Sequence, residues 1–595
     1  MRALAYVVAA LVVSGAVMVA RPAAAQAPGE SSAVVAIDCD HECLTGFARD
    51  YMRALAARDP SKAHFAAHVR FTENNVELAI GKEGLWATVS GVASSGLEAA
   101  DPTTGEAAWL GAVEEHGLPV YYGMRLRVRE HAVVEVETVV VRTTGLPLPF
   151  GDVSKLVHDP AFAQVLPEQE RRPRERLVAV ANSYFSTVEL NDGTVFAPFD
   201  PDCARVENGI YTTRAGAGSS GNIAQGCEQQ FKLGIYRINK RVRERRFPLV
   251  DVERGVVVAT GFFDHANEFD TYKTTDGVER KTLLKWPNSI SLVEAFRIRN
   301  GRIERIEAVF TYVPYFMHSP FYAYPSDSSG APREAEASSS GRPCDQACLI
   351  DLADRYMNAL VRREPATLPW AKHVRYTENG VPMMIGDGIW GSARSKSAEA
   401  LRIADAETGT AVWYGVVFEH DAPAYYGVRL RVQDQKIEEV EALVARARNP
   451  GPFGDPAKFK VDATLNARLA SAQRQTREGM IALAQNDSNT GYRRIENGVD
   501  VKDGKDPSDR IRSRRVVAVD PERGLIVTTS LADYGLKDTQ YVTADGKQRE
   551  TRVKYPSTRE MLEIFKLRGG KVQLVESISV FQPYGMPSAW VLPGG

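Results

Sequence analysis

An internal repeat limits the folds open to this chain more than any other feature of its sequence. The segment from Cys39 to Asn74 returns as Cys344 to Asn379, at an offset of 305 residues within a chain of 595. Both segments carry Cys-x3-Cys-Leu, a Tyr-Met pair in a helix-like run, and the closing motif His-Val-Arg-(Phe/Tyr)-Thr-Glu-Asn. Such self-similarity indicates that one structural unit is used more than once, so we predict two tandem modules.

The first 25 residues predict a cleavable secretory signal. Arg2 precedes an apolar run from Leu4 to Ala20, and the small residues Ala23-Ala24-Ala25 follow it. A transmembrane anchor is the alternative, but the run barely approaches the roughly 20 residues that a helical span needs. We therefore expect a periplasmic or secreted protein that loses residues 1–25 and has no membrane span afterwards.

The length and composition of the remaining chain favour several globular domains. The chain has 44% hydrophobic and 25% charged residues, and its length alone suggests about four domains. Its 73 basic residues are balanced by 75 acidic ones, without a concentrated basic block. Because nucleic-acid binding needs a basic surface, we expect no nucleic-acid partner.

Six cysteines fall into three pairs in a chain that we expect to be exported. Exported chains oxidise their cysteines, and the repeat favours one pairing among those possible. The i, i+4 pairs lie near the upper end of the bridgeable Cα separation, so they are plausible bridges. A zinc site is the weaker alternative, since no cluster offers four ligands at a recognisable spacing. The predicted disulfides are Cys39–Cys43, Cys203–Cys227 and Cys344–Cys348.

The order of elements in the first unit predicts an α+β domain at residues 37–150. Leu44, Phe47, Tyr51 and Leu55 follow a helical spacing that Asp59-Pro60 interrupts. Strand-like runs that alternate apolar and polar residues come later, as expected for half-buried antiparallel strands. Helices followed by a curved antiparallel sheet give a domain with a concave face. The later elements are a strand at 69–71, a short helix at 84–86, and strands at 107–113, 119–129 and 133–142.

The same order of elements recurs along the chain and predicts four domains. Residues 170–325 form a second, more distant unit, and the Ser-, Gly- and Pro-rich residues 326–343 form a linker. Residues 344–450 repeat the first unit, and residues 465–590 form a shorter, degenerate copy of the second. We expect two tandem two-domain modules, with the two sheets of each module packed face to face.

The sequence also resembles a known superfamily. Helix, strand with an acidic tip, short helix and bent antiparallel sheet is the order found in the cone-shaped nuclear transport factor two-like fold. The motifs Cys-x3-Cys-Leu, Thr-Glu-Asn, Gly-(Leu/Ile)-Trp and Pro-Tyr-Gly-Met resemble a secreted, largely uncharacterised SnoaL-like family, over nearly the whole mature chain. The resemblance implies four cone-shaped α+β domains. It also implies kinship with polyketide cyclases and ketosteroid isomerases.

The resemblance to ketosteroid isomerase implies a Tyr–Glu pair that abstracts a proton beside a carbonyl group. There, a helical Tyr stabilises the oxyanion, and a carboxylate at the end of the next strand is the base. Tyr51 and Glu73 are 22 residues apart here, and so are Tyr356 and Glu378. The alternative is structural, because Glu-Asn is also good turn chemistry at a strand end and a helical Tyr is commonly core.

The other two units match this pattern less well. Tyr184 precedes Glu207 by 23 residues. The fourth unit keeps Glu496, but its helix has no corresponding Tyr, which puts its activity in doubt. His116 and His420 are candidate acids or second bases, with a loop histidine in a structural role as the alternative.

Further residues are candidates for ligand binding. Arg125 and Arg127 alternate with apolar residues, as do Arg429 and Arg431, and they either bind an anionic group or form a solvated face. Trp86 and Trp390 either line the cone or fill its narrow end. The full set of ligand-binding candidates is Asn74, Trp86, Tyr122, Arg125, Asn379, Trp390, Tyr426 and Arg429.

Two functions remain open from the sequence. The first is a cofactor-independent lyase, isomerase or hydrolase acting on a small apolar molecule. The second is a non-catalytic ligand-binding or scaffold protein, since one fold hosts both kinds of function. We see no phosphate-binding Gly loop, Ser-His-Asp set or metal-ligand motif, so we expect no cofactor and no metal.

Overall fold

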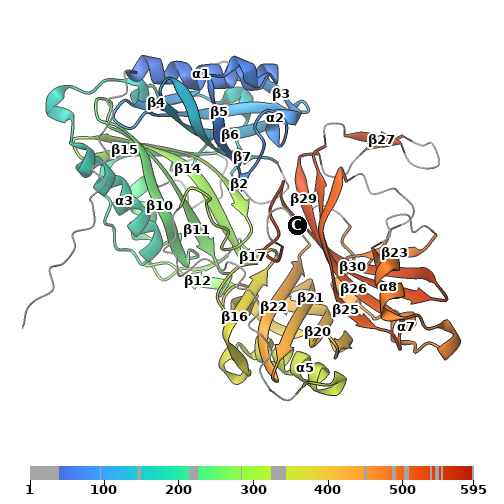
Figure 1. Ribbon diagram of the computed structural model, residues 1–595. Coiled ribbons are helices and arrows are strands. Elements are labelled where there is room, and N and C mark those ends of the chain that lie inside the picture. Colours follow the sequence, from blue (N-terminus) through green and yellow to red (C-terminus); the bar gives the residue numbers. More distant parts are fainter. Residues whose placement is uncertain are drawn as a thin grey trace, which may run out of the picture. The chain divides into compact units, whose positions relative to one another are not determined.

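Four large β-sheets, each with its own helices, form most of this computed structural model (Figure 1). The fold is α+β, and we number the four sheet-bearing parts as domains 1 to 4 in chain order. The predicted signal at 1–25 and the predicted linker at 326–342 lie outside the described residues. The structure describes residues 39–93, 96–143, 149–213, 225–282, 284–322, 343–447, 452–485, 491–501, 508–536, 539–542, 548–550 and 554–591.

Domain 1 places one amphipathic helix on a seven-stranded sheet (Figure 1). The helix starts after Asp40, whose carboxylate accepts a hydrogen bond from the Cys43 N–H, and it ends at Arg58 in the left-handed conformation. Its buried face includes Leu44, Tyr51 and Leu55. The elements are α1 His41–Ala57, β1 Phe65–Glu73, β2 Val76–Glu77, α2 Leu85–Thr88, β3 Val89–Val92, β4 Leu97–Asp101, β5 Glu106–Glu115, β6 Leu118–Arg129 and β7 Ala132–Val141.

Domain 3 repeats domain 1 element by element. Asp345 caps its first helix through the Cys348 N–H, and Arg363 ends that helix in the left-handed conformation. The strand order is the same as in domain 1. The elements are α5 Gln346–Arg362, β16 Trp370–Glu378, β17 Val381–Pro382, α6 Ile389–Ser392, β18 Ala393–Lys396, β19 Leu401–Asp405, β20 Thr410–Glu419, β21 Ala422–Gln433 and β22 Lys436–Ala445.

Domains 2 and 4 have six-stranded sheets and a separate two-stranded hairpin. The elements of domain 2 are α3 Arg174–Leu190, β8 Phe199–Glu207, β9 Ile210–Tyr211, α4 Cys227–Lys232, β10 Arg241–Asp251, β11 Val256–His265, β12 Thr271–Lys273, β13 Glu279–Lys281, β14 Asn288–Arg299 and β15 Arg302–Val313. Those of domain 4 are α7 Ala463–Asn466, α8 Arg477–Ala484, β23 Arg493–Glu496, β24 Val499–Asp500, β25 Arg510–Asp520, β26 Leu525–Tyr534, β27 Gln540–Val542, β28 Gln548–Glu550, β29 Ser557–Arg568 and β30 Lys571–Pro583. Helix α8 has 8 residues and α3 has 17, so domain 4 is the reduced copy.

One strand pair in each large sheet corrects the expectation of a purely antiparallel sheet. β1 runs parallel to β7, and the same holds for β8 with β15, β16 with β22, and β23 with β30. Parallel partners need a long connection between them, and here the rest of the domain supplies it. The first strand therefore reaches the middle of its sheet beside the last strand, which places its acidic end next to the end of that last strand.

The two sheets of each module pack face to face. In the first module, residues of β4–β7 and of β10–β15 share one buried apolar cluster that includes Leu110, Val139, Val258 and Val293. An equivalent cluster joins domains 3 and 4. The sheets approach so closely at Gly123 that an added Cβ would lie 3.1 Å from the Val309 Cβ. This contact explains why glycine interrupts the Tyr-Tyr-Gly strand.

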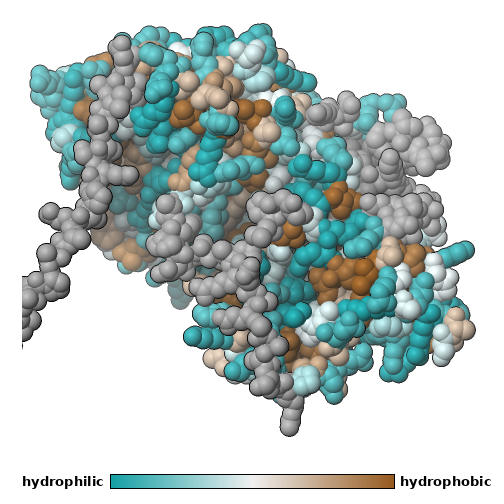
Figure 2. Space-filling model, viewed as in Figure 1, coloured by the Kyte–Doolittle hydropathy of each residue, from teal (hydrophilic) through white to brown (hydrophobic). Residues whose placement is uncertain are grey.

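The two modules also contact each other through a smaller apolar cluster. It combines one or more residues from every domain, including Val76, Phe262, Val381 and Met586. The face shown in Figure 2 is mostly hydrophilic, with hydrophobic residues in separate groups. Burial between domains thus accounts for much of the apolar surface that each sheet presents.

The structure forms the three disulfides that the sequence favours. Cys39–Cys43 and Cys344–Cys348 each close one turn at a helix start, with Cα separations of 5.2 and 5.3 Å. Cys203–Cys227 joins β8 to α4 across 24 positions of sequence. No described cysteine is free.

Candidate functional site

The motif glutamate of domain 1 ends strand β1 and is held by two partners. Glu73 is 4% exposed, and its Oε2 accepts the Leu85 N–H at 2.7 Å. Its Oε1 accepts from Nη2 of Arg142, the residue after β7, at 2.9 Å. The carboxylate therefore caps the short helix α2 and pairs with a guanidinium at the same time.

Arg142 joins Glu73 to a second buried carboxylate. Its Nε and Nη2 donate to Glu115 at 2.6 and 2.9 Å, and the Thr88 hydroxyl donates to Glu115 at 2.6 Å. Burial disfavours the charged guanidinium, but Glu115 and Glu73 together raise the pKa of Arg142 above its usual value. We call Glu73, Arg142 and Glu115 the first triad.

Domain 3 contains a matching second triad, which is Glu378, Arg446 and Glu419. Glu378 accepts the Ile389 N–H at 2.7 Å and Arg446 Nη2 at 3.1 Å. Arg446 Nη2 also donates to Glu419 at 3.0 Å. Burial raises the pKa of Glu378, and the Arg446 charge and the Ile389 N–H oppose that rise.

The asparagine after each motif glutamate has the same structural task in all four domains. Asn74 has φ 47°, and its side-chain amide bridges the N–H and C=O of Val140 at 2.8 and 3.0 Å. Asn208, Asn379 and Asn497 also have positive φ and make equivalent bridges to the last strand of their sheets. The Glu-Asn motif therefore locks the first strand to the last, as the turn-chemistry alternative describes.

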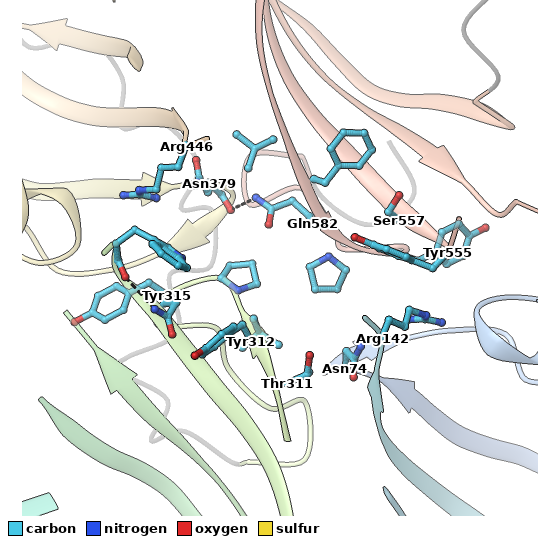
Figure 3. A pocket seen from close by; sticks show the side chains of 18 of the residues that line it. Asn74, Arg142, Thr311, Tyr312, Tyr315, Asn379, Arg446, Tyr555, Ser557 and Gln582 are labelled. Atoms are coloured by element: carbon cyan, nitrogen blue, oxygen red, sulfur yellow. Dashed lines mark hydrogen bonds between the residues drawn. The ribbon is translucent and has the colours of Figure 1, made fainter. Parts of the chain in front are cut away.

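A pocket of about 200 Å³ lies where the two modules meet, and it brings both motifs together. Its lining includes Glu73 and Asn74 from domain 1 and Glu378 and Asn379 from domain 3. The Asn379 carbonyl oxygen accepts from Gln582 Nε2 at 2.8 Å, as Figure 3 shows. Side chains from all four domains thus enclose one space.

Domains 2 and 4 supply the aromatic part of this pocket in corresponding pairs. Trp286 and Tyr312 of domain 2 match Tyr555 and Phe581 of domain 4, and all four rings are half-buried. Figure 3 shows Tyr312 on one side of the space and Tyr555 on the other. Ser557 also lines the pocket, is 2% exposed, and its hydroxyl has no hydrogen-bond partner. Buried hydroxyls are normally paired, so this one is free to bind a ligand.

The predicted tyrosines lie in the domain cores, apart from the pocket lining. The Tyr51 hydroxyl lies 3.1 Å from the Tyr122 hydroxyl and accepts the Trp86 indole N–H at 3.1 Å. All three side chains are at most 2% exposed. Burial raises the pKa of Tyr51 above its usual value. The structure therefore brings Tyr51, Tyr122 and Trp86 together, but it places them on the core side of Glu73.

Domain 3 repeats this aromatic core with looser hydrogen bonds. The Tyr356 and Tyr426 hydroxyls lie 3.5 Å apart, and Tyr356 contacts Trp390 edge-on at 5.4 Å between ring centroids. The phenol nearest the glutamate is instead Tyr376, whose hydroxyl donates to Glu378 at 3.4 Å. Phe71 holds the matching position of domain 1, so this contact is confined to domain 3.

The two predicted histidines make reciprocal contacts between the modules. His116 Nε2 lies 2.9 Å from the Leu536 carbonyl oxygen of domain 4. His420 Nε2 lies 2.7 Å from the Asn267 carbonyl oxygen of domain 2. Both histidines have positive φ in tight turns, and neither is among the pocket residues.

The arginines of the Tyr-Tyr-Gly strands correct the expectation of a solvated face. Arg125 is 1% exposed and donates to Glu106, Glu135 and Glu137. Arg429 is 4% exposed and pairs with Glu439 and Glu441. They are buried because their strand face packs against the neighbouring sheet of the module. Neither lines the pocket.

Several pocket residues were missed by sequence reasoning. Arg142 and Arg446 end equivalent strands of the repeat, and that shared position was the available signal. Trp286 and Tyr555 precede a Pro at equivalent positions of domains 2 and 4. Nothing in the sequence shows that these strand ends converge on one space.

Domain 2 buries a different acidic group inside its own core. Glu294 lies on β14 between Leu292 and Phe296, which belong to the core beneath α3. Its Oε2 has no hydrogen-bond partner. Burial and the nearby charge of Glu207 raise the pKa of Glu294 to about 8, against the Arg205 guanidinium and the Tyr184 hydroxyl.

Arg205 is the centre of the polar groups around Glu294. Its guanidinium is 1% exposed, and Nη2 donates to Gln230 at 2.6 Å and also to Tyr236. Its Nη1 lies 3.5 Å from the Tyr184 hydroxyl, and its Nε lies 3.6 Å from Glu207. The structure therefore brings Tyr184 and Glu207 near one guanidinium and Glu294.

Metal and membrane signals were sought in the same ranges. Among the described residues, no group of three or more His, Cys, Asp or Glu side chains could hold a metal ion. The described helices include none that is long and apolar enough to cross a membrane.

Comparisons with solved structures give only weak similarity. "Crystal structure of a de novo designed protein with curved beta-sheet" is 18% identical, covers 24% of this chain and 88% of that chain, and has a TM-score of 0.15. "Crystal structure of putative ketosteroid isomerase from Kribbella flavida DSM 17836" is 19% identical, covers 20% of this chain and 94% of that chain, and has a TM-score of 0.15. TM-scores this low support no argument about fold or activity. No curated protein matches the chain.

One protein family matches more than half of the chain. Its description is "Domain of unknown function (DUF8021)", and it matches residues 170–310, 343–444 and 473–579. These three segments lie in domains 2, 3 and 4, in agreement with a repeated domain. The chain belongs to this DUF8021 family.

Proposed function

We propose that this protein binds a small organic molecule in the pocket between its modules and does not use Glu73 or Glu378 as a catalytic base. The unpartnered Ser557 hydroxyl among half-buried aromatic rings carries this proposal. Both glutamates are already committed to a guanidinium and to a backbone N–H. A general base needs a free oxygen within reach of the substrate, which these contacts remove.

A fragment screen by thermal shift tests the binding proposal. The wild-type chain is compared with Ser557→Trp and Thr311→Trp, which each fill the pocket from a different domain. Fragments that raise the Tm of wild type should lose that effect in both variants. The exposed change Ser61→Trp is the matched control and should keep the effect. Equal shifts in filled and unfilled proteins would refute binding at this pocket.

A second candidate function is proton-transfer catalysis within domain 2. Glu294, with its unpartnered oxygen and a pKa raised to about 8, favours it. A protonated Glu294 and the Tyr184 hydroxyl could donate to an enolate oxygen, while Glu207 takes the proton from the adjacent carbon. This role would move the predicted Tyr–Glu chemistry from domain 1 to domain 2.

Deuterium exchange of small ketones in heavy water tests this second function. Proton NMR would follow loss of the signal from hydrogens beside the carbonyl. Exchange above the buffer rate should fall at least tenfold in Glu294→Gln and Glu207→Gln, and should persist in Glu73→Gln. The second function is excluded if all three variants exchange at the wild-type rate.

We also propose that the protein is exported. The apolar leader and the three disulfides support this location, because disulfides persist in oxidising compartments. Expression with the native leader should place the chain outside the cytoplasm, shortened at or near Ala25. N-terminal mass spectrometry measures this directly.

A further inference from the structure

We propose that the pocket between the modules selects a small organic cation, such as a quaternary ammonium group that carries a hydroxyl. This inference rests on the binding function proposed above and names the chemical class of its ligand. Three properties of the pocket support it, which are its charge, its aromatic lining and its one free hydroxyl.

The charged groups of the pocket leave a net negative charge. Each triad places one guanidinium between two carboxylates, and both triads border the same space. The other lining side chains are uncharged. An ionised pair of triads therefore carries two more negative than positive charges. An anionic ligand would be repelled, whereas a cation would be attracted through a medium of low dielectric.

The aromatic rings supply the surface that a soft organic cation prefers. Trp286, Tyr312, Tyr555 and Phe581 come from two matching pairs of positions and are all half-buried at the pocket. A cation over an aromatic face gains about 0.5–2 kcal/mol, most where water is excluded. The Arg142 guanidinium already lies over the Tyr555 ring, 5.7 Å from its centroid. That ring is therefore in a setting that accepts positive charge.

The size and the free hydroxyl restrict the ligand further. A volume of about 200 Å³ lies below the ~300–1,000 Å³ of ordinary drug-sized pockets. It suits a molecule with a handful of heavy atoms. The Ser557 hydroxyl lies beside Tyr555 in Figure 3 and can accept or donate one hydrogen bond. A hydroxyl on the cation would satisfy it.

Three probes of nearly equal shape separate charge from size. Choline, its uncharged isostere 3,3-dimethyl-1-butanol, and the anion pivalate would be titrated into the full-length protein by calorimetry. Choline should bind at least tenfold more tightly than the isostere, and pivalate most weakly. Raising the salt concentration from 20 to 500 mM should weaken choline but leave the isostere unchanged, because salt screens charge alone.

Two variants test whether the rings supply the selectivity. Trp286→Leu and Tyr555→Leu keep apolar bulk but remove the aromatic face. Each should weaken choline at least fivefold and change the isostere by less than twofold. Phe196→Leu is the control, because Phe196 is 52% exposed and outside the pocket. Urea denaturation of each variant shows whether it is folded, and an unfolded variant is replaced by Trp286→Met or Tyr555→Met.

The outcomes distinguish this inference from the binding function on which it rests. Equal affinity for choline and the isostere would overturn the cation, yet binding that is lost in Ser557→Trp would keep the pocket as a site. Tighter binding of pivalate than of choline would also overturn it. Failure of all three probes, together with fragments that ignore the filled pocket, would overturn both proposals.

Discussion

Domains 1 and 2 each bury a glutamate near a helical tyrosine, but they surround it differently. Glu73 of domain 1 has a guanidinium on one oxygen and a backbone N–H on the other. Glu294 of domain 2 has one oxygen without a partner, and burial raises its pKa to about 8. Both side chains are at most 4% exposed, so burial alone does not separate them.

The difference teaches that the partners, and not the motif, decide what a buried carboxyl can do. The Glu-Asn motif drew attention to Glu73, yet its contacts make that residue a cap and an ion-pair partner. Glu294 belongs to no motif, yet it keeps a free oxygen. Stability should therefore depend on the triad in domain 1, and proton chemistry should be confined to domain 2.

Removing the guanidinium of domain 1 should have the largest effect on this comparison. Arg142→Met leaves Glu73 and Glu115 buried without their counter-charge, so the free energy of unfolding should fall by about 3–5 kcal/mol. Urea denaturation measures the loss. Arg53→Met is the matched control, because Arg53 is 67% exposed in its pair with Asp50, and it should cost less than about 1 kcal/mol. Equal losses would show that the triad does not hold domain 1 together.

The disulfide of domain 2 gives the next largest effect. Cys203 lies two residues before Arg205, and Cys227 begins the helix that carries Gln230. Cys203→Ala with Cys227→Ala should lower stability by roughly 3 kcal/mol in the chain-entropy account. The one-turn bridge Cys39–Cys43 closes a much shorter loop and should cost roughly 2 kcal/mol when removed the same way. A larger loss for the short bridge would contradict this account.

The titration of Glu294 should appear as a pH dependence of stability. Its pKa is about 8 in the folded state, so the folded state keeps a proton that the unfolded state releases above about pH 4.5. Stability from this group is therefore full below that pH and is lost as pH rises towards 8. Between pH 5 and pH 7, wild type should lose about 2 kcal/mol relative to Glu294→Gln. The exposed change Glu42→Gln should show no such slope.

Much of the fold could be predicted because it is written locally. The helix around Tyr51, the short helix at Trp86 and the long alternating strands follow from side-chain periodicity, and the structure has them at α1, α2, β6 and β7. The internal repeat then carried the same elements to domain 3. The favoured cysteine pairing is also present in the structure.

The rest depends on contacts between distant segments, which periodicity does not encode. Alternation along β6 put Arg125 on one face, but it could not show that another sheet and three carboxylates cover that face. The parallel pairing of β1 with β7 likewise depends on sheet order. The pocket needs residues from four domains to converge, so its rings at Trp286 and Tyr555 stayed hidden.

The smallest expected effect comes from removing one phenol oxygen in each domain. Tyr51→Phe takes the acceptor from the buried Trp86 N–H, so it should cost about 1–2 kcal/mol of unfolding free energy. Tyr184→Phe removes only a contact of 3.5 Å to Arg205, which keeps its bonds to Gln230 and Tyr236, so it should cost about 0.5 kcal/mol or less. Ketone exchange should respond in the opposite order, because only Tyr184 lies beside Glu294. A Tyr51→Phe protein that keeps full stability but loses exchange would return the chemistry to domain 1 and reverse the assignment of the two interiors.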